Sequence, residues 1–383
     1  NLGNGEDAKE EGEILSSGVG TVAESSTVEP RQLPGSNAVM GFSTGRVFRI
    51  NTNHGQFFTG ARGTASLSRG HARLDHQWIE DRFQSDPDLG VATFLPASPQ
   101  APPERIALAA PKTTDVLRIR PAAVPPGLRL DPLAPAPAEI QLRGTAASVK
   151  ASYYSAAFIL RSVASELLDI DPEELSVSNL RAVPGGDGRH VGEIVVNDYL
   201  PNGAGFTSWI ANHLLDVLHA ATALPADPET FAGALVQPRH REVCDHACPD
   251  CLRTYRNMSY HGLLDWRLGL SLLRVLVDPA YACGLDGNFG FPELATWLED
   301  ARKLRDSFCS AFPALRPETF GRLPGLFVGG IAVLLVHPLW DASHPDGLLA
   351  EARVVIPQAR EVRYIDSFNL QRRPSWTYQA LGA

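Results

Sequence analysis

The sequence predicts an α+β fold, in which a helical region surrounds a short sheet and β-rich segments lie on both sides. Three observations lead to this prediction. Stretches with apolar residues at helical spacing occupy the middle of the chain, within residues 146–300. Alternating or short apolar runs, typical of strands, lie before and after that region. A cysteine-rich loop, residues 244–251, falls between the helices and is expected to staple them together.

Composition limits the class of protein. A chain of 383 residues with 44% hydrophobic content is long enough for two or three domains. It has no run of eighteen apolar residues and no charged-then-apolar leader, so we expect a cytoplasmic protein without a membrane span. The net charge of −9 argues against a uniformly basic nucleic-acid binder. Arginines far outnumber lysines, which fits either a GC-rich coding sequence or a need for guanidinium groups that bind phosphates.

The N-terminal part divides into two predicted regions. Residues 1–36 are polar, acidic and rich in Gly and Ser, and they cannot bury enough apolar surface to order themselves, so a disordered acidic linker is predicted. Residues 37–145 are predicted to be β-rich and Pro-rich. An alternating stretch at 46–58 indicates a strand, and the prolines of 94–140 favour loops and edge strands around one extended segment, 114–121.

The central region, residues 146–300, carries the clearest helical patterns. Residues 146–170 have apolar side chains at helical spacing and stop before a proline, which predicts a long helix. The stretch 193–206, "EIVVNDYLPNGAGF", indicates a strand, a glycine-bearing turn and the start of another helix. Residues 263–278 are apolar nearly all round and predict a buried helix.

The C-terminal region, residues 301–383, is predicted to contain strands again. The apolar runs at 330–341 and 352–368 are the two candidate strands.

The cysteine loop predicts a metal site. Cys248 and Cys251 form a C-x-x-C pair, and Cys244 precedes them by four residues. A two-residue gap lets two sulfurs turn inward on one knuckle, and three soft thiolates favour zinc over a hard cation. An iron–sulfur cluster and a set of buried or redox-active thiols remain alternatives. An odd cysteine count and the absence of a leader count against a disulfide.

Three cysteines leave one coordination position open. The candidates are His240, His246, His261 and the remote cysteines Cys283 and Cys309. His246 would have to fold back across a very short loop. His261 follows the last cluster cysteine by ten residues and opens the buried helix, so it can reach back to the knuckle. We therefore expect His261 as the fourth ligand of a closed, structural zinc site, with His240 as an equally workable spacing.

The stretch "CDHACPDCLRTYRNMSYHGLLDW", residues 244–266, resembles a zinc-binding domain found in or beside superfamily 2 DNA helicases. These are the MrfA-type repair helicases and the helicase components of DISARM- and Druantia-like antiphage systems. The shared features are the clustered cysteines, the "CL-x-x-Y-x-N" continuation and the His–Leu–Asp helix start. The resemblance covers about residues 146–280. The chain departs from members with four clustered cysteines, because Asn257 stands where another cysteine would be expected.

The resemblance implies a non-catalytic, zinc-stabilised accessory part of an ATP-dependent DNA helicase or helicase complex, in antiphage defence or DNA repair. Its partners would be DNA and helicase motor domains, on the same or a separate chain. Motor activity itself is not expected here. None of the four lysines follows the G-x-x-x-x-G-K-[ST] glycine run of a phosphate-binding loop, and the "NGAGF" turn at 202–206 is better explained as a tight strand-to-helix turn.

If the chain helps to hold DNA, guanidinium groups would meet phosphates and an aromatic ring would stack on a base. The candidates are Arg253, Arg256, Arg372, Arg373 and Trp376, with Tyr378 as an alternative stacking residue.

A second function of a different class is a metal-dependent nuclease or hydrolase. It would use Glu193 or Asp198 together with His213 or His337. The two carboxylates lie five positions apart on one strand and so point to opposite faces, which weakens this hypothesis.

Overall fold

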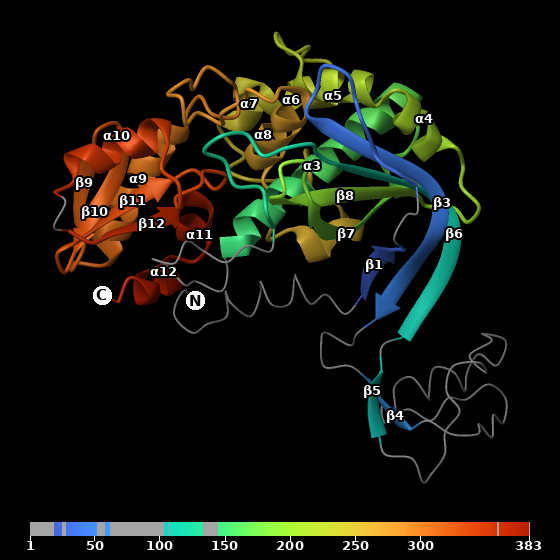
Figure 1. Cartoon of the computed structure of the whole chain (residues 1–383), viewed down its shortest axis with the longest axis horizontal. Coiled ribbons are helices and arrows are strands. Elements are labelled where there is room, and N and C mark those ends of the chain that lie inside the picture. The colour runs from blue at the N-terminus through green and yellow to red at the C-terminus, as the bar shows by residue number, and fades with distance from the viewer. Residues whose placement is uncertain are drawn as a thin grey trace.

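The structure is a computed structural model that combines two main sheets with packed helices and confirms the α+β class (Figure 1). It describes residues 19–24, 28–51, 58–61, 103–106, 108–132, 145–357 and 360–382. Within these ranges, no helix is both long and apolar enough to span a bilayer.

The larger sheet is antiparallel throughout, with the order β1-β3-β6-β8-β7 and β2 paired to the start of β3. A separate ribbon pairs β4 with β5. The strands are β1 (Val19–Ala23), β2 (Arg31–Gln32), β3 (Ala38–Asn51), β4 (Phe58–Ala61), β5 (Pro103–Ile106), β6 (Leu108–Pro121), β7 (Leu175–Pro184) and β8 (His190–Asp198).

The predicted extended segment 114–121 lies in β6, but β6 is an interior strand and not an edge strand. It pairs with β3 along its whole length and with β8 over Val116–Ile119. Pro111 and Pro121 both lie outside that doubly paired stretch. The segment between them therefore keeps its amide donors for both neighbours, which is why the prolines do not force it to the edge.

Two short strands lie inside the predicted disordered segment 1–36. The described residues of β1 pair with β3 from Val19↔Asn51 to Ala23↔Val47, and β2 pairs with the first residues of β3. Docking on a preformed long strand supplies the backbone partners that this polar segment could not supply alone. Residues 1–18 lie outside the described ranges.

The helices cover the larger sheet and then connect it to the second one (Figure 1). Helix α3 packs on β7 and β8 with one side and on α8 and α5 with another, so it is buried along most of its length. The helices are α3 (Thr145–Leu168), α4 (Phe206–Asn212), α5 (Leu214–Thr222), α6 (Phe231–Val236), α7 (Pro238–Arg241), α8 (Trp266–Val277), α9 (Trp297–Ala311), α10 (Gly347–Val355), α11 (Ser367–Arg372) and α12 (Pro374–Ala380), with the short turns η2 (Pro172–Glu174) and η3 (Tyr255–Tyr260).

Helices α3 and α8 cross at very close range. A Cβ atom placed on Gly269 of α8 would lie 2.8 Å from the carbonyl carbon of Ser155 and 2.8 Å from Cδ1 of Ile159. The Ser155 hydroxyl accepts a hydrogen bond from the backbone amide of Asp265 at 2.7 Å. The Asp265 carboxylate in turn accepts the amides of Arg267 and Leu268 and caps α8. The start of α8 is thus fixed to the middle of α3.

The C-terminal sheet has the order β12-β11-β10-β9, with β11 and β12 parallel. Its strands are β9 (Arg316–Phe320), β10 (Leu323–Val328), β11 (Ile331–Val336) and β12 (Val362–Asp366). The predicted strand at 352–368 begins too early, because residues 347–355 form α10. Asp346 caps this helix, and Leu348, Leu349 and Ala352 are buried at helical spacing. Helix α10 is the crossover that the parallel pair requires.

The crossing of α3 and α8 predicts the effect of one added methyl group. Gly269→Ala should lower the free energy of unfolding by about 1–2 kcal/mol, because the cost of overpacking exceeds the gain in helix propensity. Gly45→Ala is the matched control, since the nearest atom to its Cβ lies 4.0 Å away. Urea unfolding of both variants measures the difference. A Gly269→Ala variant as stable as the Gly45→Ala variant would contradict the close contact.

Candidate metal centre

The structure brings three sulfurs and one imidazole together. Nε2 or Nδ1 of His240 and the Sγ atoms of Cys244, Cys248 and Cys251 all lie within 4.8 Å of one another. Helix α7 carries His240, and the loop that follows carries the cysteines. His240 and Cys244 are one helical turn apart, and the amide of Cys244 donates to the carbonyl of His240 at 2.9 Å. The four side chains therefore come from one short, locally bonded segment.

The distances match those of a tetrahedral zinc site. Cys248 Sγ lies 3.6 Å from Cys251 Sγ, and Cys244 Sγ lies 3.9 Å from Cys251 Sγ. His240 Nε2 lies 3.6 Å from Cys248 Sγ. Zinc–sulfur bonds of about 2.3 Å in a tetrahedron would place the sulfurs about 3.8 Å apart. The described residues thus fit a divalent, thiophilic ion without rearrangement.

The ring orientation of His240 suits a ligand. Its Nδ1 lies 2.8 Å from the carbonyl oxygen of Leu235. A carbonyl can only accept, so Nδ1 carries the proton and Nε2 presents its lone pair to the sulfurs. Metal-binding histidines are commonly oriented in this way by a backbone carbonyl.

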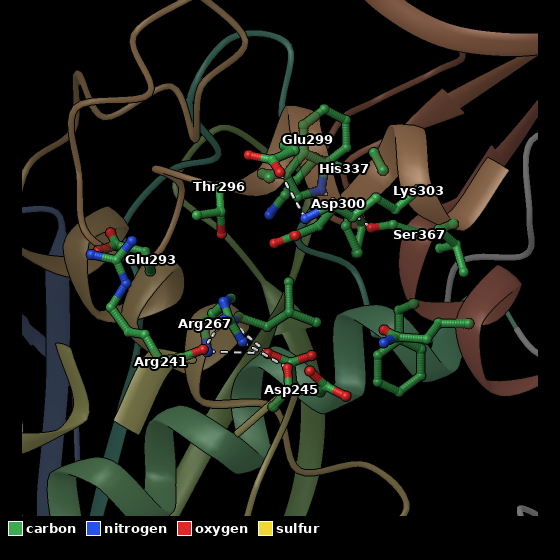
Figure 2. A pocket seen from close by; sticks show the side chains of 18 of the residues that line it. Arg241, Asp245, Arg267, Glu293, Thr296, Glu299, Asp300, Lys303, His337 and Ser367 are labelled. Atoms are coloured by element: carbon green, nitrogen blue, oxygen red, sulfur yellow. Dashed lines mark hydrogen bonds and ion pairs between the residues drawn. The ribbon is translucent and has the colours of Figure 1, made fainter. Parts of the chain in front are cut away.

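The knuckle is held by its own backbone and by the start of α8. The amide of Cys248 donates to Cys251 Sγ at 3.0 Å, which turns both sulfurs inward. From α8, Trp266 Nε1 donates to the carbonyl of Cys244 at 3.3 Å. The guanidinium of Arg267 donates to the carbonyls of Cys244 and Asp245, at 3.2 and 2.7 Å, as Figure 2 shows for Asp245. The loop is therefore fixed on the helix that crosses α3.

The three thiols do not share their protons equally. The hydrogen bond from the Cys244 thiol lowers the pKa of Cys251 to about 5, while that same bond raises the pKa of Cys244. Burial, followed by the bond to Cys251, raises the pKa of Cys248. The cluster thus favours a thiolate at Cys251 over one at Cys244 or Cys248. A bound cation would replace the thiol protons that now stabilise this sulfur, so metal binding would release protons.

His261, the expected fourth ligand, lies outside this cluster. Its Nε2 is 3.0 Å from the carbonyl oxygen of Thr254 and 2.9 Å from Oδ1 of Asn257. Both partners are acceptors, so Nε2 is protonated and unable to bind a metal. The structure brings His240, and not His261, within 4.8 Å of the three sulfurs. The physical reason is the local conformation. The segment between the knuckle and α8 forms η3, so the imidazole of His261 points to the backbone of that segment and not to the sulfurs.

The side chain of Asn257 connects several parts of that segment by hydrogen bonds. It is buried, and its Nδ2 donates to the carbonyl of Leu252 at 2.7 Å. Its Oδ1 accepts the amide of Thr254 at 2.8 Å together with the imidazole of His261. The residue that stands where a fourth cysteine was expected therefore ties the loop together without facing the cluster.

The arginines expected at DNA differ in their surroundings. The guanidinium of Arg372 donates to the carbonyl of Gly262 and, at 2.9 Å, to that of Leu264, and burial lowers its pKa to about 10. Arg373 is buried and lies over the ring of Trp376, 5.3 Å from its centroid. Neither guanidinium is presented to solvent. Arg253 is partly buried, whereas the side chain of Arg256 remains 61% exposed.

The carboxylates of the nuclease hypothesis are not paired. Both oxygens of Asp198 are occupied: one accepts the amides of Ala204 and Gly205, and the other accepts the amide and the hydroxyl of Thr207. This arrangement fixes the turn into α4, where Gly203 and Gly205 have positive φ. Glu193, on the opposite face of β8, is partly buried, and burial raises its pKa. Among the described residues, neither belongs to a cluster that could hold a metal.

A cleft of about 880 Å³ opens beside the knuckle, between the start of α8, α9 and α11 (Figure 2). Carboxylates outnumber cations on its walls by six to three. The acidic residues are Glu242, Asp245, Asp265, Glu293, Glu299 and Asp300. The cations are largely engaged, since Arg267 holds the knuckle and Lys303 pairs with Glu299 at 2.7 Å. This cleft is unsuited to a polyanion.

Comparison with known proteins gives one partial relative. No family model matches the chain. The Druantia protein DruE of Escherichia coli (strain UMEA 4076-1) is 34% identical over 124 residues, which is 32% of this chain and 6% of DruE. The match therefore spans a small part of that relative's length. The crystal structure of the DUF1998 helicase MrfA bound to DNA aligns with 67% of this chain and with 24% of the MrfA chain, at 11% sequence identity. The TM-score of this alignment is 0.33, which does not establish a shared fold.

The surroundings of Arg372 predict a structural role. Arg372→Ala should lower the free energy of unfolding by about 2–3 kcal/mol, because two carbonyls of the segment before α8 lose a charged donor. It should leave the salt dependence of DNA binding unchanged. Urea unfolding and a salt titration measure these two effects, with the exposed Arg316→Ala as control. A stable variant with a flatter salt dependence would instead show that Arg372 meets phosphate.

Proposed function

We propose that this chain is a zinc-stabilised accessory module of an ATP-dependent DNA helicase or helicase complex, which helps to hold DNA and packs on the motor domains. The proposal extends to a role in antiphage defence or DNA repair. The observation that carries it is the cluster of His240, Cys244, Cys248 and Cys251, with all four ligand atoms within 4.8 Å.

Zinc is the ion that the donor set favours. Three thiolates and an imidazole are soft and borderline ligands, which hard cations such as magnesium do not prefer. The four positions of a tetrahedron are all filled by side chains, so a bound ion would have no open position for water or substrate. A closed site of this kind stabilises structure and does not catalyse. The knuckle, α7 and the start of α8 would be the parts that the ion holds.

The context of a helicase complex rests on sequence similarity. The 124-residue match to Druantia protein DruE agrees with the resemblance of the cysteine stretch to helicase-associated zinc domains. An accessory role is favoured because the whole sequence lacks a lysine-bearing phosphate loop. The glycine turn before α4 offers no substitute, since the carboxylate of Asp198 already takes the amides of Ala204, Gly205 and Thr207.

Metal analysis of matched histidine variants tests the site. The purified chain should contain about one zinc. His240→Ala should weaken zinc binding by more than about 100-fold in a chelator competition, since even outer partners of metal ligands are worth 10–100-fold. His261→Ala should keep its zinc, because the imidazole of His261 bonds to Thr254 and Asn257 and not to the metal. Both variants lose one imidazole from neighbouring segments, so each is the control for the other.

Two outcomes would contradict this assignment. Full zinc occupancy in the His240→Ala variant together with loss in the His261→Ala variant would restore His261 as the ligand. A brown protein with visible iron–sulfur absorption would remove zinc altogether.

ATP hydrolysis tests the accessory role. The zinc-loaded chain alone should show no turnover above background, with or without DNA, because no lysine is placed to hold the β- and γ-phosphates. The measurement is phosphate release at saturating ATP. Turnover that disappears in a Gly203→Ala variant would overturn the accessory role, since Gly203 belongs to the glycine turn that leads from β8 into α4.

A further inference from the structure

A second groove, of about 830 Å³, shares no lining residue with the acidic cleft. Its walls come from β3 and β6 of the larger sheet, from α3, from the turn after β8 and from η3. The segment η3 directly follows the cysteines, so the groove borders the part of the chain that the knuckle and Asn257 hold in place.

The groove is cationic, although the chain as a whole is acidic. Four cations line it against one carboxylate, that of Glu173. The cations are Arg49, Lys112, Arg161 and Arg256. Arg256 neutralises Glu173, with Nε 2.5 Å from the carboxylate oxygen. Three positive charges remain to attract an anion into a confined space, where the field is focused by the low-dielectric walls.

Arg161 is the most buried of the cations that line the groove. It is only 6% exposed, lines the groove from α3, and its Nε has no hydrogen-bond partner among the described residues. Burial lowers the pKa of its guanidinium, and the negative charges of Glu173 and Asp171 oppose that effect. A buried cation with an unpaired donor is costly unless something satisfies it. A phosphate in the groove would supply a negative charge opposite this guanidinium.

Aromatic rings accompany these charges. Tyr255 is 88% exposed although it lines the groove, and Met258 beside it is 56% exposed. On the facing turn, Tyr199 is 47% exposed, and the charges of Lys112 and Arg256 lie 5.3 and 5.6 Å from its ring centroid. Large apolar surfaces that stay exposed next to a charged groove mark a binding site. Rings interleaved with cations are the composition of surfaces that bind unpaired nucleic-acid strands.

We propose that this groove binds a single strand of DNA, with phosphates at Arg49 and Arg161 and a base stacked on Tyr255. Lys112 adds positive charge to the groove while its Nζ donates to the carbonyls of Asp198 and Tyr199. The assignment rests on the proposed function and deepens it, because it says where and in what form the module holds DNA. A base can stack on an exposed ring only when it is not paired, which favours a single strand over a duplex. It also moves the DNA contact away from Arg372 and Arg373, whose guanidinium groups are engaged in the fold.

Fluorescence anisotropy with a labelled oligothymidine of about 16 nucleotides tests the groove in the full, zinc-loaded chain. Tyr255→Ala should weaken binding about 5- to 100-fold, and Tyr255→Phe, which keeps the ring, should bind like the parent chain. Arg49→Ala should reduce the slope of log affinity against log salt by about 0.7, because one phosphate contact is lost. Arg316→Ala, on β9 of the other sheet, should change neither quantity.

The outcomes separate the groove from the proposed function. Tight binding that is unchanged in both the Tyr255→Ala and Arg49→Ala variants would overturn the groove and leave a DNA-holding module. No binding by the parent chain at low salt, with zinc present, would overturn the holding of DNA itself. Tighter, Tyr255-dependent binding of an oligouridine of equal length would overturn DNA in favour of RNA. Binding of duplex DNA in preference to both would exclude stacking.

Discussion

Where α3 and α8 cross, two buried helices approach so closely that Gly269 has no room for a side chain. The Ser155 hydroxyl occupies the same crossing and accepts the amide of Asp265, which begins α8. Trp266 and Arg267 follow at once and bond to the carbonyls of the cysteine loop. The position of the knuckle is therefore fixed by the interior of the fold: the helix crossing that holds the cysteine loop in place contains none of the residues of the Cys/His cluster.

The segment between the knuckle and α8 shows how a polar loop is kept ordered beside such a crossing. Asn257, His261 and Arg372 together satisfy carbonyls of this segment that would otherwise lack donors. An imidazole used in this way is not free to bind a metal. The imidazole that does lie beside the sulfurs comes from the N-terminal side, where α7 presents His240 one turn before Cys244 and the carbonyl of Leu235 binds its Nδ1.

Local patterns predicted the parts of this structure that depend on local physics. The spacing of apolar residues located α3 and α8, and the C-x-x-C pair located the knuckle, because each is decided within a few residues. The choice between His240 and His261 depends on which imidazole meets a carbonyl, a contact that spacing alone does not reveal. The interior position of β6 was likewise missed, since the prolines in its sequence suggested an edge, while their effect depends on which residues β8 pairs with. The strand β1 needs β3 as its template and has no strong pattern of its own.

The distribution of charge connects the knuckle to the groove. The chain carries a net charge of −9, yet the two cavities differ in sign: six carboxylates line the cleft beside α9, whereas four cations and one carboxylate line the groove around Arg161. A polyanion that approaches would be repelled from the first surface and drawn to the second, so orientation follows from charge before any specific contact forms. The groove wall that carries Tyr255 is the continuation of the cysteine loop. On the proposed function, zinc would then support DNA binding without touching DNA, because it orders the segment that presents the stacking ring. That coupling needs only the described bonds of Asn257 and the knuckle, which connect the Cys/His cluster to the groove through one hydrogen-bonded loop.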